Sequence, residues 1–481
     1  MQIPERVLYL EPPSISVAMK AQQDWPLHPV STARFTREPD YRLQLKIEGK
    51  IKNNHGSFFG ESVPPGTVVR AAENPDLFAE SHAFTFVFKH AWPGPFNMNF
   101  PENKGTLTFQ PTTTAMSRKD QSAPTALTVF YFFNGLDRAS FAYDRSLRVK
   151  ARTTTTMSID DAPFASHEQD SESGVFVQHL KIKSFDCYFG SNEPDQTRKD
   201  RTSFLIILGD FGFGYEFAFE FGRFCSFLTG VEIIPLGYRK FSDSLNVNSA
   251  EYWNVGREDL NIVQQVSPHP LIPTGMGNKE RGNLTNQISN LFEQHLLLND
   301  QFKLSVLYWH FIQFSYLPFD LQIHPLATAL DLFKKSWFES SRSESKGRNL
   351  SDIQYAPVIK AMIPQLVASL GASEEAQSIL RRIENANMMS ETQKGRTLFR
   401  ELGIDLTQAE EGLLGFRNRA IHGSHGSIQT QKRFLITGGF RSLLGRAILK
   451  LLSYDGMYVD YASLGFPCRH ISEPVQLSDE E

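Results

Sequence analysis

The N-terminal half of the chain alternates apolar and polar side chains over short runs. Residues 41–49 place Leu43, Leu45 and Ile47 on one side of an extended segment, which is the two-residue period of a half-buried strand. Further runs rich in Phe, Val, Thr and Tyr, residues that fit a pleated surface, occupy residues 82–89, 126–133, 175–182 and 203–208. We therefore expect residues 1–235 to form a β-rich domain. It also contains an apolar stretch over 215–228 that predicts one buried helix.

One stretch of this half lacks the strand pattern. Residues 153–172 begin with four threonines and continue as an acidic, serine-containing run. Polar, low-complexity sequence of this kind is typical of a solvated loop or linker. A loop is the expectation for this stretch.

From about residue 284 the apolar residues recur with a helical period. Leu304, Leu307, Tyr308 and Phe311 fall three or four residues apart, so they line one face of a helix. Pro325 suits the first turn of the next helix. Further helices are predicted over residues 353–370, 373–388, 392–402, 407–421 and 434–452, the last interrupted near residues 438–439.

These patterns predict an α+β multidomain protein. The expected divisions are a β-rich domain over 1–235, a proline-containing connecting segment over 236–283, an all-α bundle over 284–460 and a disordered tail over 461–481. A chain of 481 residues is long enough for two or three such domains.

The composition excludes several classes of protein. Hydrophobic residues make up 41% of the chain and charged residues 21%, as in soluble globular proteins. A net charge of −4 argues against a protein that coats nucleic acid along its whole surface. The three cysteines are far apart, so neither a zinc site nor a disulfide framework is predicted. No apolar signal sequence or membrane span is evident, which predicts a cytoplasmic protein without membrane contact.

The densest chemistry lies in residues 415–423, which read GFRNRAIHG. They place a guanidinium, an amide and an imidazole within one and a half helical turns. No acidic residue occurs between Glu411 and Asp455, so this region should attract an anion such as RNA. The residues expected to contact RNA there are Arg419, His425, Lys432 and Arg433.

Arg417, Asn418 and His422 are the candidate catalytic residues. Cleavage of RNA by a neighbouring 2′-OH needs a proton acceptor, a proton donor and a cation that stabilises the phosphorane, but no metal. His422 is the candidate base or acid, Arg417 the phosphate clamp and Asn418 the orienting group. One imidazole seldom serves both proton transfers well, so a two-fold dimer that supplies a second His422 is chemically attractive.

A structural interpretation of the same residues remains open. An Arg and a His five residues apart occur easily by chance. His422 followed by Gly423 also fits an ordinary helix C-terminus, where an imidazole interacts favourably with the negative end of the helix dipole.

The Arg417, Asn418 and His422 pattern resembles the motif of HEPN-domain ribonucleases, in which four residues separate the arginine from the histidine and a polar residue commonly follows the arginine. Residues 325–330 with Phe333 look like the early helix of the ApeA-like branch of that superfamily, and residues 451–460 look like its ending. The resemblance is specific over about 325–460 and only architectural over 1–235.

The resemblance implies an all-α, metal-independent and dimeric ribonuclease domain behind a β-rich domain, in a protein of antiphage abortive infection. It implies RNA as the substrate, with tRNA one candidate, no cofactor, and a β-rich domain that senses a phage-derived activator or restrains the nuclease. Assembly of dimers into a higher oligomer is an open alternative. The alternative is a non-catalytic HEPN dimerisation module, with the β-rich domain binding a phage protein or ligand.

Overall fold

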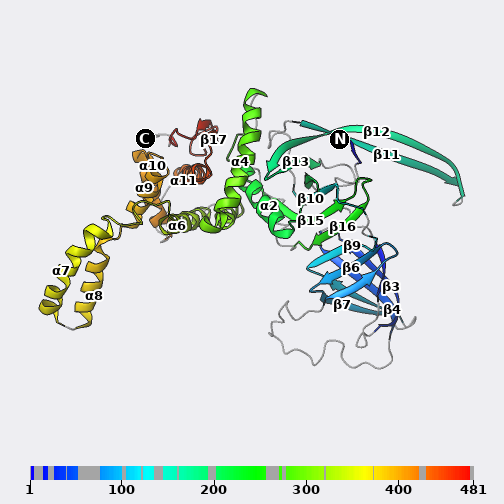
Figure 1. The fold of residues 1–481 in the computed structure, drawn as a ribbon, viewed down its shortest axis with the longest axis horizontal. Coiled ribbons are helices and arrows are strands. Elements are labelled where there is room, and N and C mark those ends of the chain that lie inside the picture. Colours follow the sequence, from blue (N-terminus) through cyan, green and yellow to red (C-terminus); the bar gives the residue numbers. More distant parts are fainter. Residues whose placement is uncertain are drawn as a thin grey trace. The chain divides into compact units, whose positions relative to one another are not determined.

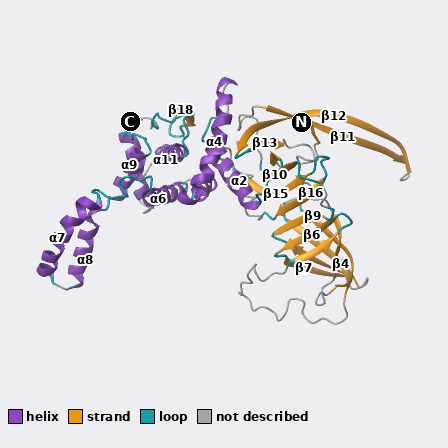
Figure 2. Ribbon diagram, viewed as in Figure 1, coloured by secondary structure: helices purple, strands orange, loops and turns teal. Residues whose placement is uncertain are grey.

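The chain forms a β-rich unit and a helical unit (Figures 1 and 2). The computed structural model describes residues 2–4, 15–19, 27–38, 41–51, 76–99, 104–120, 123–134, 145–159, 162–192, 202–255, 270–273, 278–318, 321–371, 373–421 and 430–476. The β-rich unit comprises residues 1–225, 231–267 and 274–289, and the helical unit comprises 226–230, 268–273 and 290–481. The predicted order, β-rich first and helical second, is confirmed.

Sixteen strands of the described residues form one continuous ladder in the order β1-β11-β12-β13-β14-β10-β15-β16-β9-β6-β5-β2-β3-β4-β8-β7. Apart from the parallel pair β1–β11, neighbours run antiparallel. Their bounds are β1 Gln2–Pro4, β2 Ile15–Met19, β3 Leu27–Arg37, β4 Leu43–Ile51, β5 Leu77–Glu80, β6 Phe84–Lys89, β7 Trp92–Asn99, β8 Lys104–Gln110, β9 Thr113–Arg118, β10 Leu127–Phe133, β11 Arg145–Ile159, β12 Ala162–Ile182, β13 Phe185–Asn192, β14 Thr202–Leu208, β15 Ile234–Phe241 and β16 Val247–Trp253.

Strand alternation builds the core of this unit. Leu43, Leu45 and Ile47 of β4 are fully buried, as their two-residue period predicts. They share one apolar cluster with Phe35 of β3 and Phe88 of β6, whose rings meet edge to face at 5.4 Å. Because β4 and β6 are not neighbours in the ladder, the sheet must fold back over itself to bury both in one core.

Helix α2 (Tyr215–Thr229) covers the middle of the sheet. Its Phe217 and Phe221 lie 5.5 and 5.9 Å from Phe130 and Phe132 of β10. All seven residues of β10 are buried, which is expected of a strand covered on both faces. The predicted helix over 215–228 is confirmed, and it stops at Gly230 (φ 69°), whose N–H donates to the Ser226 carbonyl.

The predicted loop over 153–172 is wrong. Strands β11 and β12 pair across it from Arg145↔Val177 to Ile159↔Ala162 and form a long antiparallel hairpin (Figure 1). Threonine is β-branched and favours extended backbone, and the hairpin satisfies its own backbone hydrogen bonds. The polar composition of residues 153–172 therefore led to the wrong expectation of a loop.

The predicted connecting segment over 236–283 is also wrong for its first part. Strand β15 pairs with β10, and β16 pairs with both β15 and β9, so both lie inside the sheet. Tyr131 of β10 pairs with Gly237 and Phe132 with Pro235, so Leu236 is the extra residue of a bulge in β15. The bulge and the adjacent Arg239 and Lys240 interrupt the alternation that would have revealed a strand.

The helical unit contains most of the helices predicted from the periodicity. Helix α4, which begins in the β-rich unit, spans Asn278–Phe302. The others are α5 Leu304–Gln313, η2 Phe314–Tyr316, α6 Ile323–Glu339, α7 Asp352–Leu370, α8 Glu374–Glu384, η4 Asn385–Asn387, α9 Glu391–Glu401, α10 Gln408–Ile421 and α11 Thr430–Leu451. None of the helices in the described part of the chain is both long and apolar enough to cross a membrane.

Helix α11 does not break near residues 438–439, contrary to the expectation. A Cβ added at Gly438 would collide with the carbonyl oxygen of Tyr461. The glycine therefore allows the chain after α11 to pack directly against the helix backbone.

The disordered tail predicted over 461–481 is wrong up to Gln476. Strands β17 (Met457–Val459) and β18 (Cys468–His470) pair with each other, and Ile471 and Val475 are buried. Residues 477–481 lie outside the described residues. The polar composition of this segment suggested that water solvates it. In the fold, partners elsewhere in the chain satisfy these polar groups instead.

Candidate nucleic-acid site in the helical unit

The predicted catalytic segment lies at the end of α10. The backbone of Arg417, Asn418 and Arg419 is helical and falls within the last turn and a half. His422 and His425 follow the helix and lie outside the described residues. The helix predicted over 407–421 is therefore confirmed, while the side chains of Arg417, Asn418 and Arg419 also lie outside what the structure describes.

The start of α10 is fixed by a capping box. The Glu410 N–H donates to Thr407 Oγ1 at 3.2 Å, and the Thr407 N–H donates back to Glu410 Oε2 at 2.9 Å. This reciprocal pair satisfies two backbone donors that an uncapped helix would leave without partners.

Glu410 also forms a buried ion pair. Its Oε1 accepts from Arg446 Nη1 of α11 at 2.7 Å and from the Val475 N–H at 2.9 Å. Arg446 donates further to the carbonyl oxygens of Ile471 (2.7 Å) and Ser472 (3.3 Å). Because the donors and acceptors of both side chains have partners, the network rigidly ties α10, α11 and the C-terminal segment together.

The other end of α10 meets the first turn of α6 and the second turn of α11. Phe416, next to Arg417, is buried against Ile323, the first residue of α6. Ile436, near the start of α11, packs on the same cluster. The three helices contact one another pairwise, so the end of α10 and the beginnings of α6 and α11 share one region.

Two features of the described residues in this region favour an anion. The first turns of α6 and α11 contain no acidic residue, and helix N-termini carry partial positive charge that favours anions. Lys432 is exposed and Arg433 half-buried in the first turn of α11, while His324 is half-buried in the first turn of α6. Basic side chains and helix N-termini at one place can hold a phosphate group.

Two cations of the acid-free stretch do not contribute to such a surface. Arg446 is buried in its ion pair with Glu410. Arg441 is also buried, and its guanidinium lies 4.5 Å from the ring centre of Tyr461 and 5.1 Å from those of Phe311 and Phe314. Burial lowers the pKa of Arg441 to about 10, with Tyr461 acting in the opposite direction, so Arg441 stays charged at neutral pH. Both arginines stabilise the bundle.

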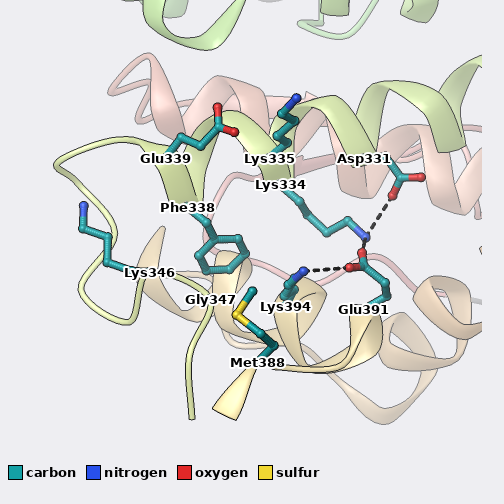
Figure 3. A pocket seen from close by; sticks show the side chains of 10 residues that line it. All are labelled: Asp331, Lys334, Lys335, Phe338, Glu339, Lys346, Gly347, Met388, Glu391 and Lys394. Carbon is teal, nitrogen blue, oxygen red and sulfur yellow. Dashed lines mark hydrogen bonds and ion pairs between the residues drawn. The ribbon is translucent and has the colours of Figure 1, made fainter. Parts of the chain in front are cut away.

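Sequence reasoning missed a pocket elsewhere in the helical unit. It lies between the second half of α6, residues 346–347 and the start of α9, and contains the ring of Phe338 (Figure 3). Its lining comes from residues as far apart in the sequence as Asp331 and Lys394, so no local pattern could have revealed it.

The chain matches no known family profile, no curated protein and no solved structure. Its function therefore has to be inferred from its own residues.

Proposed function

We propose that the helical unit is a HEPN-type endoribonuclease that cleaves RNA without a metal. The observation that carries the proposal is the position of Arg417 and Asn418 near the end of α10, where Phe416 packs against the first turn of α6 and the second turn of α11. A scissile phosphate bound there would meet two helix N-termini as well as the Arg417 segment.

In this reaction the 2′-oxygen of the RNA forms a bond to the adjacent phosphorus, and the bond from phosphorus to the 5′-oxygen breaks. One imidazole takes the proton of the 2′-OH, and a protonated imidazole returns a proton to the 5′-oxygen. Arg417 grips the non-bridging phosphate oxygens, and Asn418 orients the reacting groups. The products are a 2′,3′-cyclic phosphate and a 5′-OH.

We infer that two copies of the chain form the complete site, because each contributes a single His422 to two proton transfers. The expected mass in solution is then about twice the 54.5 kDa of the chain, measured by light scattering after size exclusion. A monomer with full nuclease activity would contradict the shared site.

We assign the activity to antiphage abortive infection in the cytoplasm, with tRNA among the candidate substrates. The β-rich unit would sense a phage-derived activator or restrain the nuclease. This part of the proposal rests on the resemblance of the Arg417 segment and on the order of the two units.

The decisive assay incubates purified protein with total RNA in EDTA and maps the new 3′ ends. We expect 2′,3′-cyclic phosphate ends from the wild type and none from His422→Ala or Arg417→Ala. His82→Ala, at an exposed histidine of the β-rich unit, is the matched control and should cleave normally.

Cleavage and toxicity that survive both His422→Ala and Arg417→Ala would overturn the nuclease assignment. A wild type that is inert on RNA with phage lysate present, and whose phenotype depends only on residues 1–235, would favour the non-catalytic dimerisation module.

A further inference from the structure

The pocket beside Phe338 has the size of a small-molecule site. Its volume is about 380 Å³, within the range of roughly 300–1,000 Å³ common for ligand pockets. It is formed within the helical unit by α6, the loop after it and α9 (Figure 3), and its lining residues are Asp331, Lys334, Lys335, Phe338, Glu339, Lys346, Gly347, Met388, Glu391 and Lys394.

One part of the pocket is aromatic and apolar. Phe338 is half-buried, and Met388 beside it is 45% exposed. Gly347 has φ +69°, and a Cβ there would stand 3.5 Å from Phe338 Cγ and 3.6 Å from Lys394 Cε. The glycine therefore brings the loop close to the ring in a backbone conformation that other residues rarely adopt. A flat ring could bind between Phe338 and the Met388 thioether.

The other part is charged and held in place by ion pairs. Lys334, only 4% exposed, contacts Asp331 at 2.9 Å and Glu391 at 2.7 Å, and Lys394 contacts Glu391 at 2.9 Å. Two ammonium groups therefore share one carboxylate. Four lysines line the pocket against three acidic residues, which leaves a net positive charge of one.

The remaining lysines form the rim. Lys335, Glu339 and Lys346 are exposed, and the Lys346 ammonium donates a hydrogen bond to the Ser340 carbonyl oxygen. The lining thus changes from an aromatic part around Phe338 to an exposed, charged part that contains lysines. Such a gradient matches a ligand with a flat ring at one end and an anion at the other.

We propose that this pocket binds a nucleotide, with the base against Phe338 and Met388 and the phosphate near Lys394 and Lys335. Bases stack on aromatic side chains, and lysine is a common phosphate ligand. The Glu391 carboxylate can accept a hydrogen bond from a base N–H, because each oxygen has a second lone pair.

The pocket is separate from the Arg417 region. Both lie along α6, which has 17 residues and is therefore about 25 Å long; Ile323 is at one end and Phe338 at the other.

The nucleotide has two sources with the same chemistry, a free mononucleotide or an unpaired nucleotide within bound RNA. The proposal does not depend on RNA cleavage.

Calorimetric titration of the full-length chain in EDTA tests the site. The probes are GMP, AMP, ribose 5-phosphate and a five-nucleotide single-stranded RNA, all with a His422→Ala background that prevents cleavage. We expect GMP or AMP to bind, ribose 5-phosphate to bind at least tenfold more weakly, and Phe338→Leu or Lys394→Gln to weaken binding about tenfold.

The matched controls are Phe78→Leu, at an exposed phenylalanine of the β-rich unit, and Lys360→Gln, at an exposed lysine of α7. Each should change affinity less than about twofold. A thermal melt by circular dichroism verifies that every variant folds, and Met388→Ala replaces Phe338→Leu if the latter unfolds.

Binding of mononucleotides identifies a free nucleotide as the ligand, and binding of the RNA alone identifies a nucleotide within RNA. Both support the site if Phe338→Leu or Met388→Ala, and Lys394→Gln, weaken the binding about tenfold. Absence of binding by all probes, or binding that these variants leave unchanged, overturns it.

Discussion

Arg446 Nη1 lies 2.7 Å from Glu410 Oε1, and both side chains are almost completely removed from solvent. The pair joins the first turn of α10 to the second half of α11. Because Val475 and Ile471 bond to the same two side chains, it also fixes the C-terminal segment. The helix that ends at the Arg417 segment is thus held from its opposite end.

Breaking this pair should strongly destabilise the helical unit. Glu410→Gln or Arg446→Met leaves the other charge buried without its counter-charge, a loss of about 3–5 kcal/mol. Urea unfolding measures it. Lys119→Gln, which removes an exposed pair with Glu80 in the β-rich unit, should cost less than about 1 kcal/mol. Similar losses for the two pairs would show that the buried network is not structural.

The Glu391 carboxylate predicts a specific acid dependence. Desolvation raises its pKa, but hydrogen bonds from Lys334 and Lys394 outweigh this and lower the pKa from 4.5 to about 2. The folded state therefore holds this carboxylate charged below pH 4.5, where the unfolded chain binds a proton. Its stabilisation is complete above about pH 4.5 and is lost as the pH falls toward 2.

Thermal melts of wild type and Glu391→Gln between pH 6 and 3 test this dependence. The wild type should be the more stable at pH 6, and the difference should shrink as the pH decreases. A difference that stays constant over that interval would assign the effect of the substitution to packing instead.

Two glycines should respond in opposite ways to alanine. Gly438→Ala would place a Cβ into the Tyr461 carbonyl oxygen, and overpacking of this kind costs about 1–3 kcal/mol. Gly412→Ala on α10 meets nothing within 4 Å, so the higher helix propensity of alanine should stabilise the fold by roughly 0.5–1 kcal/mol. The same sign for both variants in urea unfolding would contradict the packing described for Gly438.

Exposed and buried cations of the acid-free stretch should affect RNA binding differently. Lys432→Gln removes an exposed charge at the start of α11 and should lower RNA affinity and reduce the slope of log affinity against log salt by about one. Arg441→Met removes a buried charge and should lower stability without changing that slope. Filter binding at several salt concentrations, with His422→Ala in every protein, distinguishes the two. Equal slopes of log affinity against log salt for wild type and Lys432→Gln would show that Lys432 does not contact the RNA.

Local periodicity was sufficient for most individual elements. The alternation in residues 41–49 and the helical spacing from Leu304 to Phe311 depend only on neighbours in sequence, and both elements form as predicted. The helix that carries Arg417 was likewise predicted from its own residues. For the candidate site, the sequence alone identified the residue types and their spacing along that helix.

Tertiary structure decided what depends on distant partners. Backbone pairing made 153–172 a hairpin, and the sheet recruited β15 and β16 from a segment that looked like a connection. From composition alone, Arg441 and Arg446 belonged to the predicted anion-binding surface. In the fold, Arg441 packs against aromatic rings and Arg446 pairs with the Glu410 carboxylate, so both side chains are buried.

The sequence by itself thus determined most of the helices and the regularly alternating strands, and where the cation, amide and imidazole lie along the chain. Only the tertiary structure decided which charges face solvent, which polar segments are ordered and that Phe338 and Lys394 line one pocket. The physical reason is that periodicity is a property of adjacent residues, whereas burial and electrostatic partners depend on residues that folding brings together.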